Sequence, residues 1–137
     1  MKKVFLFSLS AAIVLFLTFL YIGKMFTDNL CANQILSEKT SPDLKYKAIV
    51  FMRNCGATTG YSLQISILEK ESEIKNQTGN ILILDDSYID LNQQKTTLNY
   101  HWQDNNNLKF YLDAKTKVYL QEAKYGSIFI HIYNLQK

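Results

Sequence analysis

Proline is nearly missing from this sequence, since Pro42 is the only one. Proline disrupts helices and central strands, so its absence after residue 42 leaves the rest of the chain free to form strands. Cysteine and histidine are also scarce: the chain has Cys31 and Cys55, and His101 and His131. These four residues lack the short paired spacing of zinc ligands, so we expect no metal and no cofactor.

An excess of one charge is also missing from most of the chain. The sequence has 15 Lys and Arg residues against 12 Asp and Glu residues, but Lys2 and Lys3 precede every acid. The remainder is therefore close to neutral, and its lysines are spread singly. Nucleic-acid binding needs clustered basic residues, so the composition argues against a nucleic-acid partner.

Residues 4–23 form one long apolar run, VFLFSLSAAIVLFLTFLYIG, without a charge. Twenty such residues are enough to cross the hydrocarbon core of a bilayer, about 30 Å thick. Lys2 and Lys3 precede the run and favour a cytoplasmic N-terminus. We therefore expect residues 1–24 to be an uncleaved, single-pass anchor in a bacterial inner (cytoplasmic) membrane. The rest of the chain would then be periplasmic or extracellular.

Two alternatives to the anchor stay open. Cleavage as a signal peptide would need small residues before the cut, whereas the best candidate, Tyr21-Ile22-Gly23, contains a large aromatic ring. Lipidation at Cys31 would need small and aliphatic residues just before it. The actual residues are Asp28-Asn29-Leu30. Both alternatives fit the sequence less well than the anchor does.

The two cysteines would both lie on the exported side. An even count in an oxidising compartment predicts a disulfide between Cys31 and Cys55. Closing this loop of about 25 residues would stabilise the fold by about 3 kcal/mol in the chain-entropy model. The alternative is a reactive Cys55 thiol, with His101 or His131 as its base and Arg53 lowering its pKa.

Residues 25–44 and 45–137 differ in pattern. We expect the first segment to hold a short juxtamembrane helix and then a turn at Ser41-Pro42-Asp43-Leu44. The second alternates apolar and polar residues, which is typical of strands. The predicted fold is therefore mainly β, with six or seven antiparallel strands in a meander. An open sheet, a sandwich and a barrel all fit this pattern.

Three hairpins and one central strand are expected in this domain. The predicted hairpins join residues 45–53 with 61–69, 96–102 with 108–113, and 117–121 with 127–133. Residues 81–84 are apolar on both faces, which predicts a strand covered on both sides. The polar stretch 70–80 is expected to be an exposed loop. Asp85, Asp86 and Asp90 lack the spacing of an EF-hand, so we expect a solvated turn there.

Two sets of residues are candidates for binding. The first lies in the connection 53–61, where two glycines bracket small residues and permit unusual backbone angles. The second is aromatic and falls out of phase with the aliphatic core positions; tyrosine-rich patches of this kind are common at interfaces. The candidates are Arg53, Asn54, Thr58, Thr59 and Tyr61 in the connection, and Tyr111, Tyr119, Phe129 and Tyr133 in the aromatic set.

The connection and the strand before it resemble a group of small bacterial envelope proteins that carry a domain of unknown function. Their pattern is a Ser-Pro turn, a Lys-Tyr-Lys-Ala strand and then R-[DN]-C-G-A-T-T-[GD]-[FY]-S. This corresponds to Ser41-Pro42, residues 45–48 and residues 53–62 here. The resemblance covers about 40 residues, and Leu44 stands where a glycine is usual. It implies export, but it supplies no catalytic residues.

These observations predict a membrane-tethered, non-enzymatic binding module with a protein partner in the envelope. The most concrete form is an immunity or inhibitor protein that acts against an exported toxin or hydrolase, with the connection 53–61 occluding its target. One alternative is a structural subunit of an envelope complex. The other is an enzyme that depends on Cys55.

Overall fold

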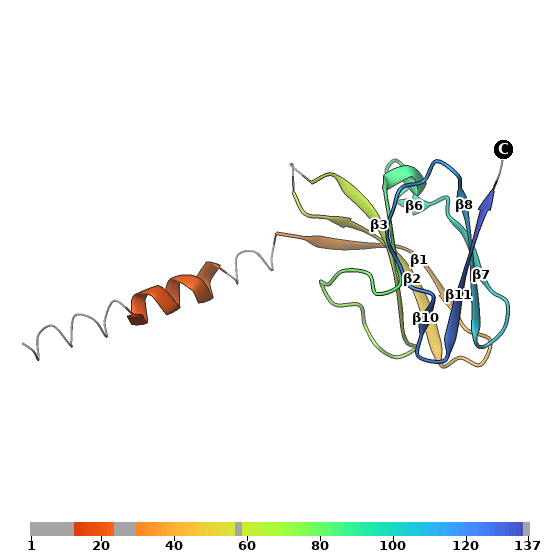
Figure 1. The fold of residues 1–137 in the computed structure, drawn as a ribbon, viewed down its shortest axis with the longest axis horizontal. Coiled ribbons are helices and arrows are strands. Elements are labelled where there is room, and N and C mark those ends of the chain that lie inside the picture. The colour runs from red at the N-terminus through yellow and green to blue at the C-terminus, as the bar shows by residue number, and fades with distance from the viewer. Residues whose placement is uncertain (1–12, 24–29, 57–58, 136–137) are drawn as a thin grey trace, which may run out of the picture. The chain divides into compact units, whose positions relative to one another are not determined.

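The structure is a computed structural model that describes residues 13–23, 30–56 and 59–135. The chain divides into two units, Met1–Cys31 and Ala32–Lys137 (Figure 1). In the first unit, residues 13–23 form a helix. Within the described ranges, no helix has both the length and the apolar character that a membrane span requires. Residues 1–12 and residue 24 of the expected anchor lie outside the described residues, and the anchor stays a prediction.

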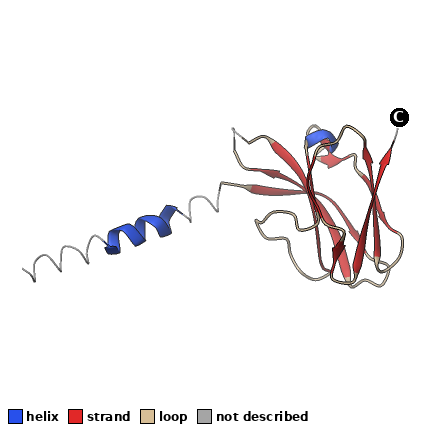
Figure 2. Ribbon diagram, viewed as in Figure 1, coloured by secondary structure: helices blue, strands red, loops and turns tan. Residues whose placement is uncertain are grey.

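The second unit is built mainly from strands, as the sequence predicts, and also contains one 3₁₀ turn (Figure 2). The strands are β1 (Ala32–Thr40), β2 (Tyr46–Asn54), β3 (Tyr61–Glu69), β4 (Leu82–Leu84), β5 (Ile89–Asp90), β6 (Lys95–Thr96), β7 (Asn99–Trp102), β8 (Asn107–Asp113), β9 (Val118–Gln121), β10 (Lys124–Tyr125) and β11 (Ile128–Leu135), and the turn is η1 (Asp86–Tyr88).

These strands form two open sheets and one small hairpin. The first sheet has the order β1-β2-β3-β4-β9, and the second has the order β10-β11-β8-β7. Strands β5 and β6 pair only with each other. The two larger sheets share one hydrophobic core, so the unit is a sandwich of open sheets.

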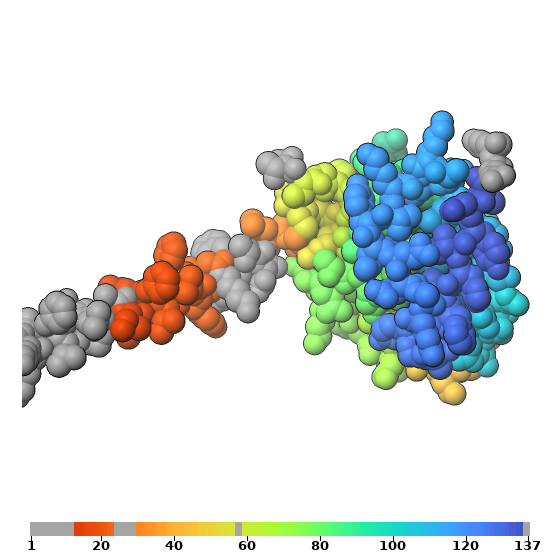
Figure 3. All heavy atoms as spheres, in the orientation of Figure 1, coloured from red at the N-terminus to blue at the C-terminus, as the bar shows by residue number. Residues whose placement is uncertain are grey.

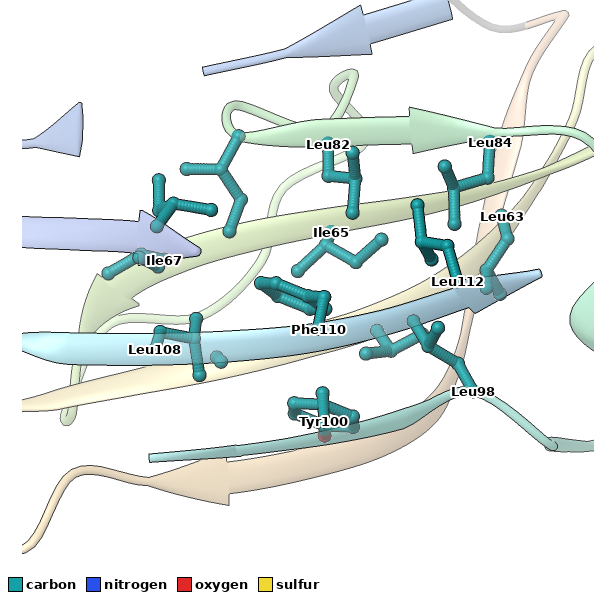
Figure 4. Close-up of a cluster of buried hydrophobic side chains, with 14 of the residues drawn as sticks. Leu63, Ile65, Ile67, Leu82, Leu84, Leu98, Tyr100, Leu108, Phe110 and Leu112 are labelled. Carbon is teal, nitrogen blue, oxygen red and sulfur yellow. The ribbon is translucent and has the colours of Figure 1, made fainter. Parts of the chain in front are cut away.

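The core lies between β3 and β4 on one side and β7 and β8 on the other (Figure 4). Tyr100 and Phe110 stack with their ring centroids 5.7 Å apart. Their strands pair in register from Asn99↔Tyr111 to Trp102↔Leu108, which confirms the predicted hairpin around the Asn- and Asp-rich turn. The buried side chains drawn there include Leu63, Ile65, Ile67, Leu82, Leu84, Leu98, Leu108 and Leu112.

Strands β2 and β3 form the predicted first hairpin, in register from Tyr46↔Glu69 to Asn54↔Tyr61. Alternating residues of β2, including Ala48 and Val50, enter the core. Ile49 and Phe51 point to the opposite face and are also fully buried. This strand is therefore covered on both sides, which the alternation alone does not predict.

The prediction of a short helix within residues 25–44 is wrong for the part of this segment that the structure describes. Residues 25–29 lie outside the described residues, and β1 runs from Ala32 to Thr40 as a strand antiparallel to β2. A register shift between Ile35 and Ser37 interrupts the pairing. Helix propensity is a weak guide here, because an open edge of β2 offers a full ladder of hydrogen bonds to this segment. The β unit thus begins before residue 45.

The third predicted hairpin, which joins residues 117–121 with 127–133, is also wrong. Strand β9 pairs with β4 in the first sheet, while β11 pairs with β10 and lies parallel to β8 in the second. The meander is therefore not wholly antiparallel. Gly126, with φ of 56°, belongs to the tight turn between β10 and β11. Alternation identifies a strand but does not specify its partner, and the chain changes sheets between β9 and β10.

Polar contacts join β1 to β7 along one side of the sandwich. Ser37 Oγ and Tyr100 Oη share a hydrogen bond of 2.8 Å, and Lys39 Nζ donates to Tyr100 O at 2.6 Å. Trp102 Nε1 donates to Lys39 O at 2.9 Å. Burial raises the pKa of Tyr100. Strand β1 is thus attached to both sheets.

Candidate functional site

A disulfide between Cys31 and Cys55 closes one end of the first sheet, as the sequence predicts. Cys31 directly precedes Ala32 and Cys55 directly follows Asn54, and these two neighbours are paired, so the bond lies where β1 enters the sheet and β2 leaves it. Because both sulfur atoms are bonded, Cys55 has no free thiol in this structure. A Cys55 nucleophile would first require reduction.

The connection after β2 is shaped by its glycines and by Asn54. Gly56 and Gly60 have φ of 100° and 66°, a region that favours glycine. Asn54 Oδ1 accepts from Gly56 N at 2.9 Å, and Thr59 Oγ1 donates to Gly56 O at 3.2 Å. Asn54 and Thr59 therefore hold the turn in the structure. Thr58, also expected to bind, lies outside the described residues.

Tyr61 lies between two depressions at this end of the molecule. Asn54, Gly56, Gly60 and Tyr61 line one depression, of about 250 Å³. The other, of about 280 Å³, is also lined by Tyr61, whose side chain is 39% exposed. Its remaining lining residues are Gln34, Leu36, Met52, Ile89, Asp90, Leu91 and Gln94. We call the two depressions together the disulfide end.

Residues of the β5–β6 hairpin form one wall of the larger depression. Asp90 Oδ1 accepts from Asn92 N and Gln93 N, at 3.0 and 3.1 Å, which fixes the turn. Gln94 has φ of 52°, unusual for a residue other than glycine. Among the described residues, no lysine or arginine forms an ion pair with Asp90. The depression therefore combines apolar side chains, two carboxamides and one unpaired carboxylate.

No motif in the sequence points to this wall. Ile89, Asp90, Leu91 and Gln94 follow β4, far along the chain from Met52 and Tyr61. Their local signal is the Asp-rich turn, and this signal alone predicts a solvated turn. The packing of the hairpin against the first sheet brings them to Tyr61, and no spacing within the sequence encodes that contact.

Arg53, expected at a binding surface, is instead 9% exposed. Its Nη1 donates to Asn33 Oδ1 at 2.6 Å and to Asn76 Oδ1 at 3.1 Å. Burial lowers the pKa of its guanidinium. Within the described part of the chain, no carboxylate forms an ion pair with it. Arg53 thus joins β1 and β2 to the loop that carries Asn76.

We call that loop, residues 70–80, the strap. Asn33 Nδ2 donates to Lys75 O and Gln77 O, at 3.1 and 2.8 Å. Gly79 N donates to Gln64 Oε1 at 2.8 Å, and a Cβ at Gly79 would lie 2.9 Å from Ile65 O. Most strap residues are exposed, as predicted, but the end of the strap is fastened to β3.

Asn80 completes the attachment of the strap. Its side chain accepts from Ile67 N and donates to Ile67 O, both at 2.9 Å, so it replaces a neighbouring strand at that point. Asn80 N also donates to Ser66 Oγ at 3.2 Å. Ile49 and Phe51 of β2 are buried although they lie outside the core cluster. Apolar residues on both faces of β2 are therefore the sequence signal that this sheet is covered on its second face.

The expected aromatic set is divided by the structure. Tyr111 and Tyr133 stack on the outer face of the second sheet, with ring centroids 5.4 Å apart. His101 continues this stack at 5.7 Å from Tyr111. Phe129 lies on an outward position of β11, whereas Tyr119 belongs to β9 in the other sheet. Three of the four residues therefore share a face.

Metal-ligating groups are not gathered at these sites. Over the ranges that the structure describes, no three His, Cys, Asp or Glu residues lie close enough to hold a metal ion. Asp85 Oδ1 accepts from Ser87 N at 3.2 Å, and Asp85 Oδ2 accepts from Lys117 N at 3.0 Å. This aspartate therefore caps η1 and fixes the start of β9.

The fold and its closed end define the chain as a small β-sandwich protein with one disulfide and an N-terminal helix over residues 13–23. The chain belongs to a family of unknown function, DUF5412, whose family model matches residues 1–125. No curated protein matches the chain significantly, and no solved structure does.

Proposed function

We propose that this chain is a membrane-anchored binding module of the bacterial envelope, and that its disulfide end contacts a protein partner. The observation that carries the proposal is the position of Tyr61. Its half-exposed ring stands between two depressions, on a hairpin that the adjacent disulfide fixes. A rigid aromatic side chain beside a depression is typical of the residues that dominate binding energy.

The chemistry of the larger depression fits a polypeptide segment. Leu36, Met52 and Ile89 offer apolar contacts, while the Gln34 and Gln94 side chains can bond a peptide backbone. The Asp90 carboxylate, which forms no ion pair with a described lysine or arginine, would favour a lysine or arginine in the bound segment. An immunity or inhibitor protein that engages an exported toxin or hydrolase is the most concrete form of this proposal.

The cellular location is part of the same proposal and has separate support. A disulfide persists in an oxidising compartment, which fits export of the β unit. The uncharged run of residues 4–23, with Lys2 and Lys3 before it, fits a single-pass anchor with a cytoplasmic N-terminus. Alkaline phosphatase fused to the C-terminus would be active if this orientation holds and inactive if the β unit stays in the cytoplasm.

Replacement of Tyr61 tests the contact surface. We expect Tyr61→Ala to weaken binding of the partner by about 30-fold, which corresponds to the roughly 2 kcal/mol typical of a central aromatic contact. The measurement is the dissociation constant of the full-length chain in mild detergent, with a partner identified by cross-linking in cells.

Tyr119→Ala is the matched control, because Tyr119 is 66% exposed and does not line either depression. We expect it to leave the dissociation constant unchanged. Equal affinities for Tyr61→Ala and the original chain, with both folded, would remove the disulfide end as the contact surface.

A further inference from the structure

Strand β11 has one edge that the second sheet leaves largely unpaired. On one side it lies parallel to β8 along most of its length, from Phe129↔Asn107 to Leu135↔Asp113. On the other side β10 pairs only through Lys124↔Phe129 and Tyr125↔Ile128. From His131 onward, no described strand pairs with this second edge.

The hydrogen bonds of β11 show which backbone groups point to that open edge. Phe129 N donates toward β8, to Asn106 O at 2.7 Å, and Ile130 N donates in the opposite direction, to Ala123 O at 3.0 Å. Because these directions alternate along a strand, Ile132 and Asn134 direct their N–H and C=O groups to the open edge. Such a row of groups is a template for another strand.

The usual features that protect an edge strand are missing from β11. It contains no proline, lysine, arginine, aspartate or glutamate, and its pairing with β8 has no register shift. Its outward side chains are large and exposed: Phe129 is 48%, Tyr133 43% and Leu135 48% exposed. In Figure 3, the C-terminal part of the chain, in blue, forms a continuous area of surface.

We propose that β11 pairs antiparallel with β11 of a second copy of this chain, about a two-fold axis at Tyr133. In this register Ile132 of one copy pairs with Asn134 of the other, so every backbone group directed to the open edge is used. Registers centred on Ile132 or Asn134 would leave some of these groups without a partner within β11.

Two further features favour a second copy over a foreign strand. The strand is uncharged, so two copies meet without like charges opposite each other. The pairing would also place Tyr133 opposite Tyr133 of the second copy and extend the stack of His101, Tyr111 and Tyr133 across the axis. Direct aromatic pairs of this kind stabilise neighbouring strands.

Cysteine cross-linking tests both the dimer and its register. In the full-length chain, Tyr133→Cys would place two sulfur atoms on directly opposite residues, at a separation that a disulfide can bridge. We expect mild oxidation in detergent to give roughly ten times more covalent dimer than Leu135→Cys. In the proposed register Leu135 pairs with His131, so two Leu135 residues lie about 13 Å apart along the strands.

His101→Cys is a second control, since His101 is exposed on β7, at the opposite edge of the same sheet. It should give no more dimer than Leu135→Cys. A mixture of Leu135→Cys and His131→Cys chains should give a mixed dimer, which tests the register even if Tyr133→Cys folds poorly. Equal dimer yields from all positions, or monomeric behaviour of the original chain in sedimentation equilibrium, would overturn the proposal.

Discussion

Replacing Arg53 with alanine should reduce the free energy of unfolding by about 2–4 kcal/mol. Its guanidinium is the hydrogen-bond donor to the side-chain oxygens of Asn33 and Asn76. Hydrogen bonds from a charged donor contribute about 1.5–3 kcal/mol each when neither group can rebond to water, and the exposure of Asn76 lowers its share. The strap should separate from the sheet as part of this change.

Urea unfolding of the full-length chain in mild detergent, with the disulfide intact, measures the stability. Hydrogen exchange of strap residues measures the local change, and the amide of Gly79 should lose protection because its bond to Gln64 depends on the attached strap. Lys75→Ala removes an exposed cation from the same strap but keeps its backbone carbonyl, so we expect a change within about 0.5 kcal/mol. Similar stabilities of the two variants would show that Arg53 does not hold the strap.

Loss of the disulfide is expected to have an effect of similar size. In the chain-entropy model, opening the loop closed by Cys31 and Cys55, of about 25 residues, reduces the free energy of unfolding by about 3 kcal/mol. The loss of stability should be largest in β1, because β1 is an edge strand of the first sheet and has an irregular register near Ile35. Amides of β1 should therefore exchange faster in the Cys31→Ser, Cys55→Ser double variant.

The original chain treated with a thiol reductant provides the control for this double variant. Both lack the bond, so both should show the same loss of stability and the same faster exchange in β1. A double variant within 1 kcal/mol of the oxidised chain, on the scale of that entropy model, would mean that strand pairing alone holds this end.

Local patterns predicted two hairpins correctly, because the two strands of each hairpin are neighbours in the sequence. Apolar alternation and the glycine-bracketed connection identified β2 and β3, and the Asn- and Asp-rich turn identified β7 and β8. The partner of β9 is β4, and the longest pairing of β11 is with β8; neither partner is the adjacent strand in the sequence. Their pairing depends on which open edge each strand meets in the folded unit, and periodicity carries no information about that choice.

The candidate site was predictable to a similar extent. The disulfide followed from the cysteine count, and Tyr61 followed from its place beside the glycines. The β5–β6 wall was missed because its residues reach Tyr61 only through tertiary packing. Arg53 was expected to face a partner, but the strap covers it. A basic residue next to a glycine-bracketed connection looks the same in sequence whether it contacts a partner or holds a loop.

Site-specific photo-cross-linking from position 61 shows directly whether the disulfide end contacts a protein partner. A photoreactive phenylalanine analogue would replace Tyr61 in the full-length chain in living cells, and the same analogue at Tyr119 would serve as the control. If the disulfide end is the contact surface, position 61 should give a discrete cross-linked product that an excess of the original chain competes away, and position 119 should give none. Cross-linking that is equal at the two positions, or found only at Tyr119, would contradict this proposal.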